Sequence, residues 1–427
     1  MTAPEIHSVS SAIWRIESPK LIGMLVRMVR SVDLAEEIAQ STFVDALERW
    51  GESGVPDNPG AWLMTAARHR AIDILRHKRR AERKHEELAR EIDTSVAADF
   101  DEAPDDVVGD DLLRLVFIAC HPVLSQEARV ALTLRLLGGL GTDEIARAFL
   151  VAEPNIAQRI TRAKRTLAEK KVPFELPSTG DLTARLGSVL EVLYLIFNEG
   201  YSATAGDDWM RPDLCQDALR LGRILAELVP REPEVHGLVA LMEIQASRAA
   251  ARVGPNGEAV LLPDQDRAKW DWLLVRRGLE GLERAEALIE ARPDAAAGQY
   301  VLQAAIAACH ARAKSVEETN WKEIAALYAK LATVTPSPVV ELNRAVAVGM
   351  AYGAEAGLEI ADALGGDPAL REYPFLPSVR ADLLAKLGRF AEAKAEVERA
   401  AELTRNERDR ALFVERSVDY GRKADAG

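Results

Sequence analysis

The segment TDEIARAFLVAEPNIAQRITRAKRTLAEKK (residues 142–171) joins a short helical pattern, a brief break and a longer helical pattern. Thr142 is suited to cap the first helix over an acidic first turn, and Pro154 stands in the first turn of the second helix, where proline is tolerated. Apolar residues recur at helical spacing from Ile156 and Ile160 onward and predict one buried stripe. The segment therefore predicts two helices joined by a tight turn.

The second of these helices is basic on its polar side. A short helix, a tight turn and a basic second helix make a helix-turn-helix, whose second helix enters the major groove of DNA. Asn155, Gln158 and Arg162 lie about one turn apart on one face, and these side-chain types make bidentate contacts with adenine or guanine. The motif predicts DNA binding, although ordinary helical hairpins also show this pattern.

The net charge of −13 over 427 residues argues against a nucleic-acid partner only if the charge is evenly spread. It is not evenly spread. Residues 1–85 and 112–172 carry net charges of +2 and +5, whereas residues 86–111 and 173–427 each carry −10. Two basic units are thus separated by an acidic spacer and followed by a long acidic half.

The first basic unit is centred on AWLMTAARHRAIDILRHKRRAERK (residues 61–84), where a helical apolar stripe is followed by eight basic residues against two acidic ones. A solvated helix face is the alternative, and the one-sided charge favours contact with phosphates. Ahead of it, residues 31–50 predict an amphipathic helix that packs its apolar residues inward and leaves Glu36, Glu37 and Gln40 outward.

Composition predicts helix almost throughout, because 48% of residues are hydrophobic and only 5% are aromatic. We expect an all-α chain with two small helical DNA-binding domains, the second a helix-turn-helix, and a C-terminal domain of helical hairpins. Residues 343–364 and 381–404 are similar to tetratricopeptide repeats, and an alanine-rich bundle without true repeats is the alternative. The expected boundaries are 10–85, 86–111 as a flexible acidic linker, 112–172, 180–335 and 336–420.

Several classes of protein are excluded. Three well-separated cysteines argue against a disulfide framework or a zinc site and fit a reducing cytoplasm. No apolar run reaches the length of a membrane span. The spacing of His69, His77 and His85 places them on different helix faces, and no Walker, nucleophile-elbow or dinucleotide motif occurs. We expect no enzyme, catalytic residue, metal, cofactor or membrane partner.

Three motifs in order, LAEEIAQSTFVDAL (34–47), PGAWLMTAARHRAIDILRHKRR (59–80) and TDEIARAFLVAEPNIAQRITRAKRTL (142–167), resemble the extracytoplasmic-function class of bacterial RNA polymerase sigma factors. The resemblance covers residues 10–172, and the remainder is similar to the helical, tetratricopeptide-like extension of one subgroup. It implies a cytoplasmic sigma factor that joins core RNA polymerase, recognises promoter DNA and initiates transcription.

The resemblance also assigns roles to residues. The predicted readers of the minus-35 element are Pro154, Asn155, Gln158, Thr161, Arg162 and Arg165. The predicted minus-ten residues are Asn58, Trp62, Arg68, Arg76, Arg79 and Arg80. The predicted contacts with the clamp helices of the polymerase β′ subunit are Glu36, Glu37, Gln40 and Phe43. The β flap is the second expected polymerase contact.

The C-terminal extension is expected to regulate the DNA-binding units in cis, or to bind a protein partner. The alternative function is a helix-turn-helix regulator with a tetratricopeptide-like sensor that never joins polymerase. Such a regulator has no need of the first basic unit, so residues 10–85 discriminate between the two hypotheses.

Overall fold

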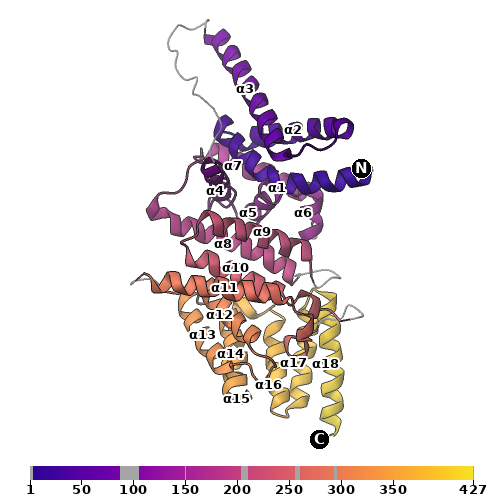
Figure 1. The fold of residues 1–427 in the computed structure, drawn as a ribbon. Helices are drawn as coiled ribbons and strands as arrows, with labels where there is room; N and C mark the ends of the chain where they lie inside the picture. Colours follow the sequence, from indigo (N-terminus) through magenta and orange to yellow (C-terminus); the bar gives the residue numbers. More distant parts are fainter. Residues whose placement is uncertain are drawn as a thin grey trace. The chain divides into compact units, whose positions relative to one another are not determined.

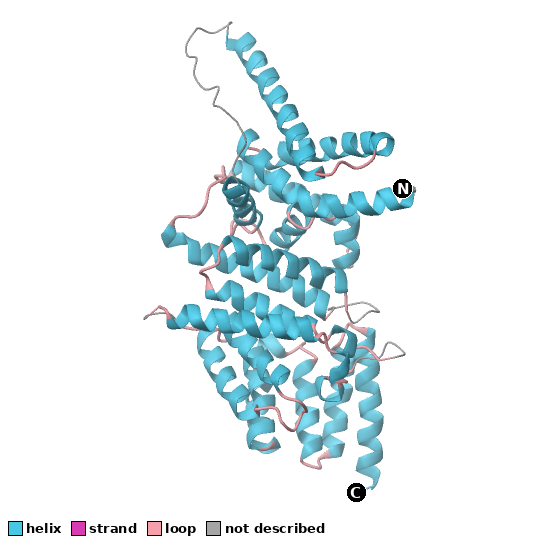
Figure 2. Ribbon diagram, in the orientation of Figure 1, coloured by secondary structure: helices cyan, strands magenta, loops and turns pink. Residues whose placement is uncertain are grey.

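A computed structural model describes residues 3–86, 105–149, 151–202, 210–254, 260–292 and 296–426. Every regular element in these ranges is helical, as Figure 2 shows. The prediction of an all-α chain is confirmed. The chain divides into two compact units, Met1–Leu193 and Tyr194–Gly427, and the division falls inside one helix, α8.

The described part of the first unit forms seven helices and the beginning of an eighth (Figure 1). Their bounds are α1 Ala3–Val29, α2 Val32–Ser53, α3 Pro59–Glu86, α4 Asp105–Ala119, α5 Gln126–Leu136, α6 Thr142–Phe149, α7 Glu153–Glu169 and α8 Thr179–Tyr201. Local signals fix several ends: Ser31 Oγ accepts a hydrogen bond from the Leu34 amide at 3.3 Å at the start of α2. Helix α2 ends at Gly54, whose φ of +82° favours glycine.

The acidic spacer is shorter than its composition suggests. Helix α4 begins at Asp105, inside the range 86–111 expected to be a linker, and residues 87–104 lie outside the described chain. Asp111 is 1% exposed, and its carboxylate accepts hydrogen bonds from Arg27 Nε at 2.7 Å and from Arg114 Nη1 at 2.9 Å. The last acidic residues of the spacer therefore form helix, and Asp111 holds α4 against α1.

The second unit is built from antiparallel helices. The longer ones after α8 are α9 Pro212–Leu228, α10 Pro233–Ala246, α11 Trp272–Glu290, α12 Gln299–Arg312, α13 Trp321–Val334, α14 Pro338–Tyr352, α15 Ala354–Ala363, α16 Phe375–Lys386, α17 Phe390–Leu403 and α18 Glu407–Ala426. Five single 3-10 turns are η1 Ala249–Ala251, η2 Leu262–Asp264, η3 Arg267–Lys269, η4 Leu364–Gly366 and η5 Pro368–Leu370. Consecutive helices from α12 to α18 pack in hairpins, as repeat proteins do.

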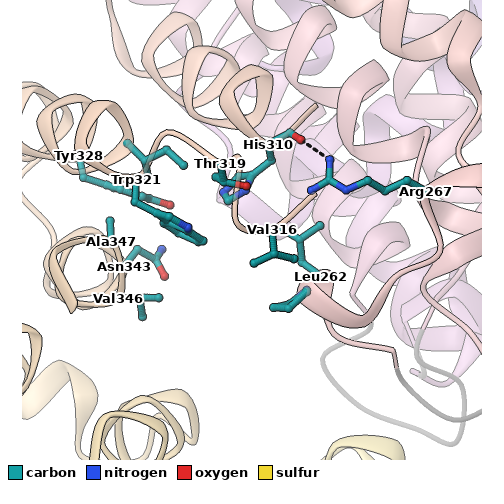
Figure 3. Close-up of a pocket in the computed structure, with 12 residues that line it drawn as sticks. Leu262, Arg267, His310, Val316, Thr319, Trp321, Tyr328, Asn343, Val346 and Ala347 are labelled. Atoms are coloured by element: carbon teal, nitrogen blue, oxygen red, sulfur yellow. Dashed lines mark hydrogen bonds between the residues drawn. The ribbon is translucent and has the colours of Figure 1, made fainter. Parts of the chain in front are cut away.

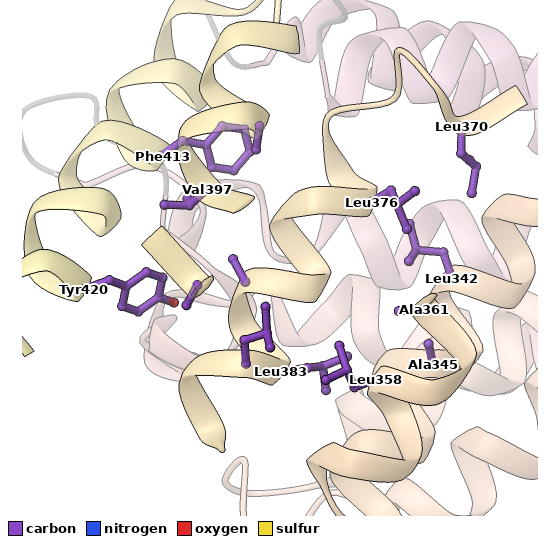
Figure 4. Close-up of a cluster of buried hydrophobic side chains, with 14 residues drawn as sticks. Leu342, Ala345, Leu358, Ala361, Leu370, Leu376, Leu383, Val397, Phe413 and Tyr420 are labelled. Atoms are coloured by element: carbon purple, nitrogen blue, oxygen red, sulfur yellow. The ribbon is translucent and has the colours of Figure 1, made fainter. Parts of the chain in front are cut away.

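Small residues bring the hairpin helices together. A Cβ added at Gly357 in α15 would lie 2.6 Å from the Ala345 carbonyl oxygen and 2.8 Å from Gly349 Cα, both in α14. One apolar cluster of α14 to α18 includes Leu342 and Phe413, as Figure 4 shows. Ala347, also in α14, belongs to a second cluster with α12 and α13. Helix α14 packs in both clusters. It therefore joins residues 180–335 and residues 336–420, which we expected to form separate domains, into one unit.

The remaining sequence signals have structural roles. Asp271 accepts hydrogen bonds from the Leu273 and Leu274 amides and caps α11. All three cysteines are buried and free. Among the described residues no group of histidine, cysteine or acidic side chains is arranged to hold a metal ion. In the same residues no helix is long and apolar enough to cross a membrane.

Candidate DNA and polymerase interface

The predicted helix-turn-helix is formed by α6 and α7. Ile145 in α6 packs inward with Ile156 and Ile160 of α7, and all three are 5% exposed or less. Pro154 occupies the first turn of α7, and the Thr142 hydroxyl donates to Glu153 Oε1 at 3.2 Å across the turn. The buried stripe therefore fixes one face of α7 and leaves the other face to solvent.

All six predicted minus-35 residues lie on the exposed face of α7. They are Pro154, Asn155, Gln158, Thr161, Arg162 and Arg165. Arg165 is engaged by Glu169 at 2.6 Å, and the Thr161 hydroxyl donates to the Ala157 carbonyl at 2.9 Å. Within the described chain, the side chains of Asn155, Gln158 and Arg162 have no hydrogen-bond partner. These three are free to contact base edges.

The predicted minus-ten residues are spread along α3. Arg76 and Arg80 are exposed, and Arg68 is half-buried, whereas the side chain of Arg79 lies outside the described residues. Asn58 Oδ1 accepts from the Ala61 amide at 3.0 Å and caps α3, so its carboxamide oxygen already has a structural role. The amide nitrogen of Asn58 remains available to donate a hydrogen bond to a base.

Trp62 belongs to an aromatic cluster at the start of α3. Its ring lies edge-on to Trp50 with centroids 5.7 Å apart, and the Arg49 guanidinium lies 5.8 Å from its centroid. Trp62 is half-buried, so the indole is held in place with part of its surface accessible. A fixed, accessible aromatic ring is suited to stack an unpaired base.

The predicted polymerase-binding residues on α2 have unequal exposure. Glu37 is exposed, and Phe43 is half-buried with its ring 4.8 Å from the Trp14 ring. Gln40 donates to Glu36 Oε1 at 2.8 Å. The prediction that Glu36 faces outward is wrong, because its side chain is only 5% exposed.

Glu36 is covered by basic residues of α5 and α7. Arg135 Nε lies 2.6 Å from Glu36 Oε1, and Lys164 Nζ lies 2.6 Å from Glu36 Oε2. Lys164 also reaches Asp33 Oδ1 at 2.9 Å. We call Asp33, Glu36, Arg135 and Lys164 the Glu36 cluster. Burial opposes the charge on Lys164, but the carboxylates of Glu36 and Asp33 outweigh it and raise the Lys164 pKa.

The Glu36 cluster joins the two halves of the first unit. Two further ion pairs join these halves. Arg27 of α1 pairs with the buried Asp111 of α4 at 2.7 Å, and Arg15 pairs with Glu144 at 2.9 Å, where both side chains are more than one-third exposed. An exposed pair contributes at most about 1 kcal/mol, whereas breaking a buried pair costs about 3–5 kcal/mol. The Glu36 cluster and the Arg27–Asp111 pair are therefore stronger links than the Arg15–Glu144 pair.

Sequence reasoning did not identify Arg135 and Lys164 as partners of Glu36. They lie 99 and 128 positions away, and Lys164 reads simply as part of the basic face of α7. Helical periodicity reports which face of one helix is apolar and carries no information about which distant helix covers a polar residue. Only the packing of α2, α5 and α7 reveals the cluster.

Comparison with known proteins identifies the class. Residues 13–81 match the family model of sigma-70 region 2, and residues 114–167 match that of sigma-70 region 4. The first range contains α2 and most of α3, and the second contains α6 and most of α7, the helix-turn-helix. Residues 185–286 match a family of unknown function, DUF6596. No solved structure matches the chain.

Individual relatives agree with these matches. An uncharacterized protein of Rhizobium meliloti is 42% identical over 403 residues, which are 94% of this chain and 93% of the relative. The RNA polymerase sigma factor CarQ of Myxococcus xanthus is 35% identical over 30% of this chain and 69% of its own length. The probable sigma factor SigI of Mycobacterium tuberculosis is 24% identical over 39% of this chain and 57% of its own length.

The chain belongs to the sigma-70 family, as an extracytoplasmic-function sigma factor with regions 2 and 4 and a C-terminal helical extension. It is therefore a non-enzymatic transcription factor of the kind that works with core RNA polymerase and promoter DNA. The match over residues 13–81 favours this function over the alternative regulator, which has no need of region 2.

Proposed function

We propose that the protein directs core RNA polymerase to promoters by reading the minus-35 element with α7 and the minus-ten element with α3. The observation that carries this proposal is the division of α7 into a buried apolar stripe and a fully exposed reading set. A recognition helix needs this arrangement, because one face must hold it on its domain while the other enters the major groove.

The minus-ten element is read, in this proposal, by the start of α3 and held by its later turns. Trp62 offers a ring against which an unpaired base stacks, and the amide nitrogen of Asn58 is free to donate to a base. Arg76 and Arg80 are exposed on the later turns of the same helix and supply positive charge to the DNA backbone.

Docking on the β′ clamp helices uses α2. Glu37, Gln40 and Phe43 supply the accessible part of this surface, and Glu36 joins it only after Arg135 and Lys164 have moved away. The described arrangement is therefore a closed form, in which region 4 occupies a carboxylate that polymerase requires. Region 4 makes the further contact with the β flap.

Replacing Arg162 by alanine tests the assignment of the minus-35 reader. Loss of one bidentate base contact costs about 1–3 kcal/mol, so we expect about 5- to 150-fold less transcription from promoters carrying the preferred base. The measurement is run-off transcription with core polymerase over a promoter library. Arg147→Ala, which removes an exposed arginine paired with Asp143 on α6, is the matched control and leaves the base preference unchanged.

Two results contradict this proposal. The wild-type protein with core polymerase transcribes no member of the library, or Arg162→Ala selects the same minus-35 bases with the same efficiency as the wild type. Failure of the wild type rejects the sigma-factor function of the chain as a whole. An unchanged Arg162 variant rejects only the residue assignment.

We also infer that the C-terminal extension regulates this activity in cis. The support is a set of contacts within the first unit, where α8 is bound to region 4. Arg185 donates to the Phe117 carbonyl at 2.8 Å, Ser188 to the Cys120 carbonyl at 2.7 Å, and Arg129 pairs with Glu191 at 3.0 Å. Helix α8, the first helix of the extension, therefore packs against region 4 through these contacts.

The test of cis regulation is a truncation placed by these contacts. A chain ending at residue 193 keeps the beginning of α8 on region 4 and removes the second unit. Coupling between sites in one protein is typically about 1–3 kcal/mol, so we expect transcription to change by about fivefold or more. A chain ending at residue 172 is the comparison, because it also removes the α8 contacts. Equal activity of the full chain and the chain ending at 193 rejects cis regulation.

A further inference from the structure

The second unit contains a cavity that no part of the proposed function uses. It has a volume of about 250 Å³ and lies among η2, η3, the end of α12, α13 and α14. Figure 3 shows Trp321, Asn343 and Val346 on one side of the space and Leu262 and Val316 on the other. Residues far apart in the sequence therefore build opposing walls.

Most of the lining is apolar or uncharged. The Trp321 ring is edge-on to the His310 ring, with centroids 5.2 Å apart and an interplanar angle of 75°. Burial, together with Arg248 and Arg267, lowers the His310 pKa to about 4, so the imidazole is neutral at pH 7. Burial raises the Tyr328 pKa to about 12, with Tyr194 adding to the effect, so this phenol is also neutral.

Arg267 is the charged member of the described lining, and it has a structural role. Its Nη1 donates to the His310 carbonyl at 2.8 Å and to the Ala313 carbonyl, which ties η3 to the end of α12. Glutamate and aspartate are absent from the described lining. The carboxylates of Glu317 and Glu318, next to lining residues in the sequence, act electrostatically on Arg267 and offset its charge. The cavity disfavours a cation for another reason: an ammonium group would lose its hydration against mostly apolar walls.

Asn343 supplies an unused polar group. Its side chain is exposed on α14 and has no hydrogen-bond partner among the described residues. Water in the rest of the cavity meets mostly apolar walls, and a well-held water needs two to four polar partners. Replacing poorly held water by an apolar group is favourable.

We propose that this cavity binds a small, flat, uncharged aromatic molecule that lies against Trp321 and hydrogen-bonds to Asn343. A volume of about 250 Å³ suits one ring or two fused rings, because pockets for drug-sized ligands begin at about 300 Å³. The site goes beyond the proposed role in transcription, and its test requires neither polymerase nor DNA.

The experiment titrates the purified full-length protein with indole as the probe, followed by saturation-transfer NMR and calorimetry. For a ligand of about nine non-hydrogen atoms we expect a dissociation constant of about 1 mM or lower. Benzylamine, a cation of similar size, binds at least about tenfold more weakly, because its ammonium group loses hydration in a cavity whose described lining holds no carboxylate. Asn343→Ala weakens indole binding by about two- to tenfold, the value of one hydrogen bond.

Val346→Phe fills the cavity from α14 and abolishes indole binding. Val346 lines the cavity and belongs to neither of the two apolar clusters described above. The larger phenylalanine side chain can therefore fill the cavity without displacing those clusters. The matched control is Val414→Phe on α18, where the valine is 52% exposed, and it binds indole as the wild type does. Circular dichroism verifies the helix content of each variant.

The proposal is overturned by any of three results. Indole at about 10 mM gives no binding signal, Val346→Phe binds indole as well as Val414→Phe does, or benzylamine binds as tightly as indole. The readout is binding to the isolated protein, so these results are distinct from a failure of the transcription assays.

Discussion

Lys164→Glu will open the closed form of the first unit and raise the affinity of the protein for core RNA polymerase by about tenfold or more. Lys164 Nζ contacts Glu36 at 2.6 Å and Asp33 at 2.9 Å, so a glutamate here replaces two attractions by two repulsions. Breaking a buried ion pair costs about 3–5 kcal/mol, which is enough to shift a two-state equilibrium strongly. Glu36 then becomes available to polymerase.

The measurement is equilibrium binding of labelled protein to core polymerase in the absence of DNA, accompanied by small-angle scattering of the free protein. Leaving DNA out separates this effect from any change at the promoter-reading face of α7. Opening of the closed form increases the radius of gyration of the free protein.

Arg165→Glu is the matched control. It makes the same charge change one position along α7, where the side chain is 76% exposed and pairs with Glu169. We expect no change in polymerase affinity from this variant. If Lys164→Glu binds polymerase no better than Arg165→Glu, the Glu36 cluster does not restrain the protein.

Gly357→Ala will destabilise the second unit by about 1–3 kcal/mol, the typical cost of overpacking. The added methyl group would lie 2.6 Å from the Ala345 carbonyl oxygen and 2.8 Å from Gly349 Cα. Both obstacles are backbone atoms, so relief requires α14 and α15 to move apart. Hydrogen exchange of the two helices, together with denaturant unfolding, measures the loss.

Gly281→Ala, in α11 of the same unit, is the comparison. Its added methyl group has Ala240 Cβ as its nearest neighbour, at an ordinary 3.4 Å. Alanine is favoured over glycine inside a helix by about 1 kcal/mol, so this variant is as stable as the wild type or slightly more stable. Equal stability of the two alanine variants contradicts the close packing of α14 on α15.

Local patterns predicted local structure. The stripe of Ile156, Ile160, Ala163 and Leu167 is buried in α7, and the charged and polar residues between them are exposed or partly exposed. The reading set on α7 was predictable for the same reason: a helix with one apolar face leaves the other face to solvent. The exposed part of the candidate site is therefore largely a consequence of sequence periodicity.

Pairing between distant residues was not predictable in this way. From composition, residues 86–111 were predicted to form a linker. Asp111 is nevertheless buried in α4, where the guanidinium of Arg27, 84 positions away, neutralises its charge. A domain boundary was expected between residues 335 and 336, yet this point is a turn between α13 and α14, which Ser337 caps. A break in helical pattern identifies the end of a helix and does not show whether the next helix packs back onto the same core.

Helix α7 carries Lys164 toward α2 and carries Asn155, Gln158 and Arg162 toward solvent. Under the proposed function, substitutions on the exposed face of α7 alter promoter choice and leave the contact with Glu36 unchanged. Substitutions at Lys164 alter polymerase binding and leave the promoter-reading side chains unchanged. If α7 and the Glu36 cluster act as proposed, duplicated copies of such a gene are free to diverge in the promoters they select while each copy keeps the proposed restraint on polymerase binding.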